Sequence, residues 1–144
     1  MKIRKALLED APQLAELSSQ FGYPTTTLQS KDRLGILLKS NEHVVLVACN
    51  PVNKVVGWVH IFMALRLESD GFAEIGGIVV SEEYRGSGIG KDLLKASGKW
   101  AADNGVQKLR IRSRSTRSDT HAIFEHLGFE KTKEQYVFDK QIDS

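Results

Sequence analysis

Three glycines stand within five residues in the segment SEEYRGSGIGKDLL, which runs from Ser81 to Leu94. Glycine lets a backbone bend sharply or come close to a ligand. An apolar helical pattern follows the glycines, and the first N–H groups of a helix lack partners and favour anions. The segment therefore predicts a place where main-chain N–H groups hold a phosphate.

Two common nucleotide-binding motifs do not fit this segment. A P-loop requires glycine five residues before Gly90 and serine or threonine after Lys91, but those positions hold Arg85 and Asp92. A dinucleotide fingerprint requires G-x-G-x-x-G, and here the third glycine, Gly90, comes one residue early. The glycines alone are also compatible with a helix start that binds nothing.

The elements that must position this loop can be read from the apolar patterns. They predict a strand, two helices, three strands, a helix, a strand, a helix and a last strand. The corresponding ranges are 1–6, 8–22, 23–40, 43–49, 55–66, 72–80, 91–105, 106–114, 118–129 and 134–140. Interspersed helices and strands favour a mixed α/β (α+β) sheet covered by helices, in a single domain over residues 1–144.

Composition limits the function classes. The chain has 144 residues and a net charge of only +2, which does not support nucleic-acid binding by itself. Arg110, Arg112 and Arg114 alternate, so one strand face is expected to be basic, beside an anionic cofactor or paired with carboxylates. Cys49 is the single cysteine and the four histidines have no ligand spacing, so neither a disulfide nor a metal is expected. No signal peptide or membrane span is recognisable, so we expect a cytoplasmic protein without a membrane partner.

The segment IVVSEEYRGSGIGKDLL resembles motif A of the GCN5-related N-acetyltransferases (the GNAT family). That family's signature is R/Q-x-x-G-x-G/A, which Arg85, Gly88 and Gly90 match. A second family pattern, N-x-x-A-x-x-F-Y-x-x-x-G-F, aligns with residues 117–129, where Gly128 and Phe129 match. The resemblance covers nearly the whole chain. It implies a single GNAT domain with a mixed central sheet of six to seven strands flanked by about four helices.

The resemblance also implies acetyl-CoA as the cosubstrate. The glycine loop would surround its pyrophosphate, and strand backbone would bind the pantetheine arm like an added strand. Arg117, which stands where the family pattern has asparagine, would reach a phosphate. The implied cofactor-binding residues are Ile78, Val79, Val80, Arg85, Gly86, Ser87, Gly88, Ile89, Gly90, Lys91 and Arg117.

Acetyl transfer to an amine requires a base, because an amine with a pKa near ~10 is mostly ammonium at neutral pH. Glu74 lies in an otherwise uncharged strand, where several family members keep a catalytic glutamate, and we expect it to be the general base. The alternative is a strand glutamate that is exposed or paired with arginine. A strand distorted at Gly76 and Gly77 would free a backbone N–H for the oxyanion, or the two glycines would allow close packing. Phe124 replaces the tyrosine that serves many relatives as general acid, so no dedicated acid is expected.

The sequence specifies the acceptor amine less well than it specifies the cosubstrate. The resemblance places the first two helices on one wall of its site, with Tyr23 as a plausible contact, and Trp58 and Glu68 are further candidates. A small-molecule or peptide amine fits as the acceptor, and the acetyl group would be transferred to it directly within a ternary complex. An acyltransferase that uses another acyl-CoA and a non-catalytic acyl-CoA-binding or regulatory module stay as alternatives. Family members are often dimers, which makes a homodimer an expectation of the resemblance.

Overall fold

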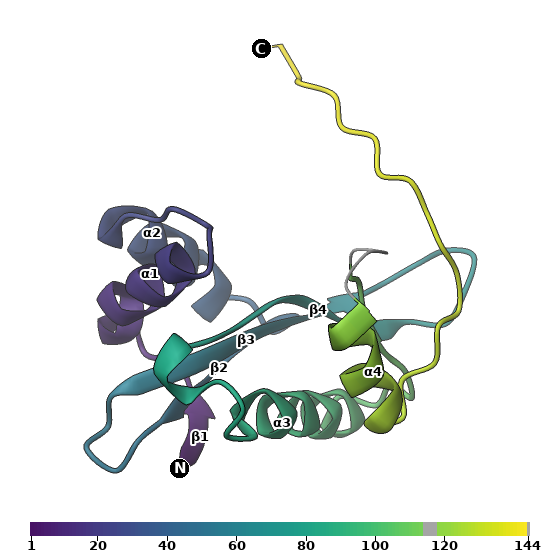
Figure 1. Cartoon of the computed structure of the whole chain (residues 1–144). Coiled ribbons are helices and arrows are strands. Elements are labelled where there is room, and N and C mark those ends of the chain that lie inside the picture. Colours follow the sequence, from purple (N-terminus) through teal and green to yellow (C-terminus); the bar gives the residue numbers. More distant parts are fainter. Residues whose placement is uncertain (114–117, 144) are drawn as a thin grey trace. The chain divides into compact units, whose positions relative to one another are not determined.

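The computed structural model describes residues 1–113 and 118–143 (Figure 1). The chain divides into two compact units, Met1–Ile111 and Arg112–Ser144. None of the helices in the described ranges combines the length and apolar composition that a membrane crossing requires. The first unit contains the sheet, the glycine loop and every expected site residue except Arg117.

Five strands form the sheet in the order of the sequence. They are β1 (Lys2–Lys5), β2 (His43–Cys49), β3 (Val55–Ala64), β4 (Phe72–Val80) and β5 (Leu109–Ile111). The first four pair antiparallel, and β5 pairs with β4 in parallel over three residues only. The last parallel pair is Ile75 with Ile111, so the rest of β4 extends beyond its short neighbour.

Helices cover both faces of the sheet, with α1 (Ala11–Gln20) and α2 (Thr27–Leu38) on one side and α3 (Ile89–Asp103) on the other (Figure 1). A 3-10 turn, η1 (Leu8–Asp10), leads into α1, and Pro12 lies in the first turn of α1, where its missing N–H costs no hydrogen bond. Thr26 and Gln29 form a capping box at the start of α2, with bonds of 3.1 and 3.0 Å. Local sequence signals therefore start both helices.

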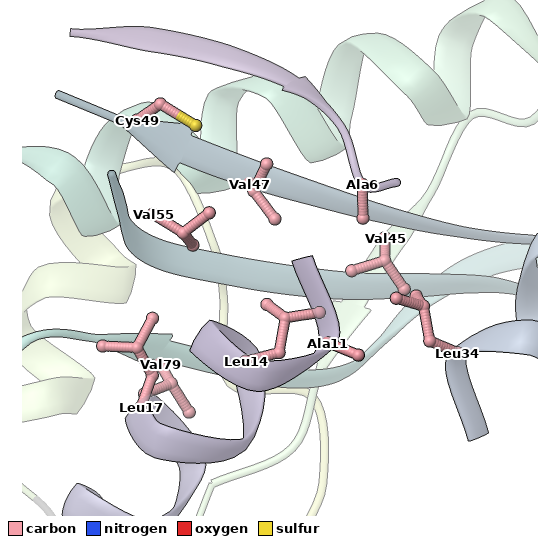
Figure 2. Close-up of a cluster of buried hydrophobic side chains, with 10 residues drawn as sticks. All are labelled: Ala6, Ala11, Leu14, Leu17, Leu34, Val45, Val47, Cys49, Val55 and Val79. Atoms are coloured by element: carbon pink, nitrogen blue, oxygen red, sulfur yellow. The ribbon is translucent and has the colours of Figure 1, made fainter. Parts of the chain in front are cut away.

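The core between the sheet and α1 and α2 is built from small and branched residues (Figure 2). Leu14 and Leu17 of α1 and Leu34 of α2 lie against valines of β2, β3 and β4. On the opposite face, a Cβ on Gly57 of β3 would lie 3.2 Å from the Ile89 side chain of α3. Glycine at this position lets α3 pack closely on the sheet and sets the height of its first turn.

A buried ion pair ties β1 to the start of α1. The Asp10 carboxylate, with its side chain 4% exposed, accepts two bonds from Arg4, at 2.8 and 3.0 Å. It also accepts the Leu7 N–H at 2.7 Å. These bonds, first of all those from Arg4, hold the pKa of Asp10 below its usual value although burial opposes this.

The second unit contains α4 (Ser118–His126), which ends at Gly128 with a positive φ of 91°. Phe129 packs against Phe124 of this helix, with ring centroids 5.9 Å apart. Residues 129–143 form neither helix nor strand, so the strand expected at 134–140 is wrong. The strand expected at 106–114 is reduced to β5 within residues 106–113, and residue 114 lies outside the described residues. The mixed sheet with four α-helices is confirmed for the described residues, but it has five strands rather than six to seven.

We predict that Asp10→Asn lowers the free energy of unfolding at pH 7 by about 1–3 kcal/mol, because it removes a charged partner of a partly buried arginine. Since the folded pKa of Asp10 is depressed, its contribution is present above about pH 4 and is lost as the pH falls through the folded pKa. Urea unfolding from pH 2 to 7 measures both effects. The exposed Asp32→Asn is the control, and equal stability of the two variants at pH 7 would contradict the assignment.

Candidate active site

The glycine loop joins β4 to α3 through a short 3-10 turn, η2 (Glu82–Tyr84). Gly86 and Gly88 have positive φ angles of 80° and 88°, which side chains rarely tolerate. Gly88 is the N-cap of α3 and makes no side-chain cap bond. The first α-helical bond runs from the Asp92 N–H to the Gly88 carbonyl at 3.0 Å, so the N–H groups of residues 89–91 lie ahead of it. This arrangement suits an anion.

The other loop residues hold or flank this arrangement. The Ser87 N–H and hydroxyl both donate to the Tyr84 carbonyl, so its side chain closes the turn. Ile89 has its side chain buried in the core, and only its backbone can serve a ligand. Arg85 and Lys91 are exposed, and the Arg85 guanidinium lies 5.5 Å from the centre of the Phe21 ring.

The outer edge of β4 is open after Ile75. Residues 76–80 pair with β3 on one side, while within Met1–Ile111 no strand pairs with them on the other. The Val79 side chain is buried, and those of Ile78 and Val80 are half-buried. Alternate backbone N–H and C=O groups of this edge can therefore bind an extended ligand arm, which is the geometry of strand addition.

A β-bulge marks the point where this edge begins. His60 pairs with Gly77, but Ile61 pairs with Ile75, so Gly76 is an extra residue in β4. A Cβ on Gly76 would lie 2.7 Å from His60 Nδ1, and one on Gly77 would lie 3.0 Å from the Trp58 ring. The glycines thus form the expected distortion and admit two rings of β3 against the backbone. A backbone N–H freed for the oxyanion stays a prediction.

Glu74 lies two residues before the bulge and is 9% exposed. It pairs with Phe62 of β3 and with Arg110 of β5, so its side chain lies on the same face as theirs. Because Phe62 and His60 alternate along β3, His60 shares that face. One face of the sheet thus brings a buried carboxylate, a histidine and the bulge together.

Two histidines on this face form a pair. His43 Nδ1 lies 2.9 Å from His60 Nε2, and the rings stack with centroids 5.2 Å apart. Phe62 extends the stack, 5.6 Å from His43 and 5.9 Å from His60. Burial, and then the charge of His43, lower the pKa of His60 to about 4, so this ring is neutral at pH 7.

Of the arginines expected on a basic strand face, Arg110 lies in β5 and Arg114 lies outside the described residues. Arg112 follows β5 and donates to Gln135 Oε1 at 3.2 Å. The cations beside β5 pack on an aromatic ring. The Arg110 guanidinium lies 4.3 Å and the Lys108 ammonium 4.5 Å from the centre of the Phe72 ring, with Arg66 at 5.7 Å. Phe72 is buried. These cations lie at the end of β4 that precedes Glu74, so they are on the carboxylate side of the bulge rather than on the glycine-loop side.

The remaining expected residues are scattered. Tyr23 is exposed but packs on Phe21, the ring that Arg85 covers. Trp58 belongs mainly to the core, and its Nε1 is buried without a hydrogen-bond partner in the described part of the chain. Glu68 lies in the exposed loop between β3 and β4. Arg117 lies outside the described residues.

No group of three or more metal-binding side chains occurs among residues 1–113 and 118–143.

Sequence reasoning missed Phe21, His43 and Phe62 as parts of this region. The period-2 pattern of β3 places Phe62 beside His60 and Trp58, and that signal was available. Nothing in the sequence indicated that His43 would contact His60 across two strands, because that contact depends on the register of β2 and β3.

The family model of the acetyltransferase (GNAT) family matches residues 8–129. The aminoglycoside N(6')-acetyltransferase type 1 of Stenotrophomonas maltophilia is 31% identical over 146 residues, covering 94% of this chain and 90% of that protein. Crystal structures of aminoglycoside 6'-N-acetyltransferases from Acinetobacter haemolyticus and Acinetobacter baumannii both superpose with TM-scores of 0.83. They are 20% and 19% identical, cover 99% of this chain, and are themselves covered over 100% and 99%.

The open edge of β4 beside the glycine loop fits an acyltransferase, and the family match and the curated relative show that class. The chain belongs to the GNAT acetyltransferase family, whose members use acetyl-CoA as cosubstrate. The resemblance read from Arg85, Gly88 and Gly90 is confirmed.

We predict that Gly88→Ala destabilises the fold by about 1–2 kcal/mol, because alanine must adopt the left-handed conformation there. Gly98→Ala, within α3, is the matched control and should stabilise by about 0.5–1 kcal/mol through helix propensity. Neither Cβ would meet another atom within 4 Å, so the difference reports the backbone alone. Urea unfolding measures it, and a neutral Gly88→Ala would show that the loop can adopt another conformation.

Proposed function

We propose that this chain transfers the acetyl group of acetyl-CoA to a primary amine by direct attack in a ternary complex. One observation carries the proposal: the uncapped start of α3, the open edge of β4 and the bulge at Gly76 follow one another along a single stretch of chain. The curated relative, an aminoglycoside N(6')-acetyltransferase, supports an amine on a small polar molecule as the acceptor. A peptide amine is the other acceptor of the same chemistry.

The cosubstrate would bind through backbone. The N–H groups of Gly86 and of residues 88–91 would hold the pyrophosphate, with Arg85 and Lys91 adding positive charge. Ser87 would keep the turn closed through its bonds to the Tyr84 carbonyl. The edge of β4 from Ile78 to Val80 would pair with the amides of the pantetheine arm. Arg117 would add a phosphate contact, as the family pattern implies. This mode explains why the loop needs glycine and a small serine more than it needs charged side chains.

The acceptor amine must lose a proton before it can attack. Glu74 would serve as general base, directly or through water, because it is buried on the sheet face that carries the bulge. The backbone at Gly76 and Gly77 would donate an N–H to the oxygen of the tetrahedral intermediate. The thiolate that leaves needs little help, since thiols have a pKa near ~8.5, and Phe124 has no proton to donate.

The acceptor would lie against α1, α2 and the loops beside them. Tyr23 and Trp58 would supply ring surface, and Glu68 a negative charge for a cationic acceptor. No metal takes part in this scheme. We further propose a cytoplasmic protein whose residues 1–144 act as one domain, as a monomer or a homodimer, with neither nucleic acid nor membrane as a partner.

We predict that Glu74→Gln lowers kcat about 100-fold or more while the Kd for acetyl-CoA changes less than about twofold, since the base acts on the acceptor. Release of free CoA with a panel of amines, including aminoglycosides that carry a 6'-amino group, measures turnover, and calorimetry measures binding. The exposed Glu16→Gln is the control. Unchanged turnover of Glu74→Gln across pH 6–9 would remove this residue from the mechanism.

We predict that acetyl-CoA raises the unfolding temperature of the wild type, because a ligand of the native state adds RT ln(1 + [L]/Kd) to its stability. Gly88→Ala should show a smaller shift at the same ligand concentration, whereas Gly98→Ala should match the wild type. Stabilisation without turnover of any amine would identify a CoA-binding module instead of an enzyme. No stabilisation at millimolar acetyl-CoA would refute the proposed cosubstrate.

A further inference from the structure

When an ammonium ion is acetylated, Glu74 alone does not account for both protons that leave the acceptor nitrogen. The nitrogen of R–NH₃⁺ forms one bond to carbon and loses two protons. One of them ends on the sulfur of CoA, and the other is released as the net product proton. Two protons leave one nitrogen, and a carboxylate holds only one proton at a time. A second proton acceptor beside Glu74 would therefore spare Glu74 from carrying both, and Phe124 cannot take part in either transfer.

The bulge brings one ring nitrogen to the place where the reaction would occur. His60 Nδ1 lies 2.7 Å from the position that a Gly76 Cβ would take, so this nitrogen lies directly over the bulge backbone. Gly76 itself is exposed, so this point of the backbone is in contact with solvent. His60 Nε2, the other nitrogen, is engaged with His43 Nδ1 at 2.9 Å. The imidazole thus spans the distance between the bulge and His43.

A hydrogen bond between two neutral imidazoles is directional. When His60 Nε2–H donates to His43 Nδ1, His60 Nδ1 carries a lone pair over the bulge. A proton that arrives at Nδ1 lets Nε2–H pass its own proton to His43 Nδ1. The hydrogen bond then reverses, and the positive charge lies on His43, at the start of β2 and half-buried.

The surroundings keep the charge from resting on His60. Burial and the neighbouring His43 disfavour its charged form. Charged groups on this sheet face include Glu74 on β4, Arg110 on β5 and Arg4 on β1. Arg4 is ion-paired with Asp10, and Lys108 and Arg66 lie over the Phe72 ring at the far end of β4. The helices α1 and α2 bury leucines against the rest of this face. A ring whose charged form is disfavoured, and which is hydrogen-bonded to a second histidine, is suited to accept a proton and pass it on.

We propose that His60 and His43 form a proton relay, in which His60 Nδ1 receives one proton of the acceptor ammonium, directly or through water, and His43 releases a proton to solvent. The inference rests on the proposed function. The C–N bond forms, the C–S bond breaks, Glu74 takes the other proton, and the CoA thiolate recovers one proton from Glu74 or water. One proton leaves through His43, which balances the reaction.

The test uses His60→Gln, His43→Phe and the double variant of the full chain, with acetyl-CoA and an aminoglycoside that carries a 6'-amino group. Glutamine keeps a polar atom for His43 but has no basic nitrogen over the bulge, and phenylalanine keeps the ring stack. We expect each variant to lower kcat/KM at least about tenfold at pH 7, with no further loss in the double variant. The exposed His126→Gln is the matched control.

The pH dependence separates a relay from a packing defect. The loss in His60→Gln should shrink as the pH rises from 6.5 to 9, because more of the amine is then already deprotonated. A ratio of wild-type to variant kcat/KM that is constant with pH, or a value of kcat/KM unchanged from wild type, would overturn the relay while leaving the acetyltransferase assignment intact. Absence of wild-type turnover with every amine would defeat the proposed function, and the relay with it.

Nuclear magnetic resonance of the histidine rings gives a readout that needs no turnover. We expect the His60 ring to stay neutral from pH 5.5 to 7 and to titrate near pH 4 in the wild type. His43→Phe should raise this pKa, because one of the two causes that lower it is removed while burial remains. Titration of His60 near 6.5 in the wild type would show that the pair is not formed in solution and would overturn the relay.

Discussion

The site depends on the point at which β4 separates from its parallel neighbour. Up to Ile75, β4 is an interior strand, hydrogen-bonded to β3 and β5. From Gly76 onward, β3 alone holds it within Met1–Ile111, and the extra residue shifts its pairing. A strand that changes from interior to edge in one step offers both a firmly held carboxylate and an accessible backbone. Glu74 lies on the first side of that step, and the edge proposed to bind the cosubstrate lies on the second.

Packing around the bulge explains why the change occurs there. The rings of His60 and Trp58 occupy the space that side chains at residues 76 and 77 would need, so only glycine fits opposite them. Trp58 also contacts the core beneath α1 and α2, and the Leu17 and Val79 side chains belong to that same core. The position of the bulge is therefore fixed by the hydrophobic core, which connects the stability of the first unit to the geometry of the candidate site.

Local signals predicted much of this arrangement. The glycines, the apolar runs of β2 to β4 and the amphipathic α3 identified the fold class and the loop, because those patterns have short-range physical causes. Apolar residue type alone does not identify the inner face of α2, because Leu28 and Leu38 are 68% and 45% exposed while Leu34 is buried in the core. The strand at 134–140 was inferred from its aromatic and β-branched residues, yet a strand also needs a partner, and sequence alone does not provide one. The His43–His60 contact was out of reach for the same reason, because it depends on register between strands.

The indole of Trp58 has a consequence for spectroscopy. Its Nε1–H is buried with no acceptor among the described residues, and its ring lies against Gly77. An indole in such a dry setting emits at short wavelength, and emission moves to longer wavelength when water or a polar group reaches the N–H. The chain has two tryptophans, and the other, Trp100, lies on α3, on the opposite face of the sheet. The fluorescence of this protein therefore contains a native reporter of events at the bulge, without any added label.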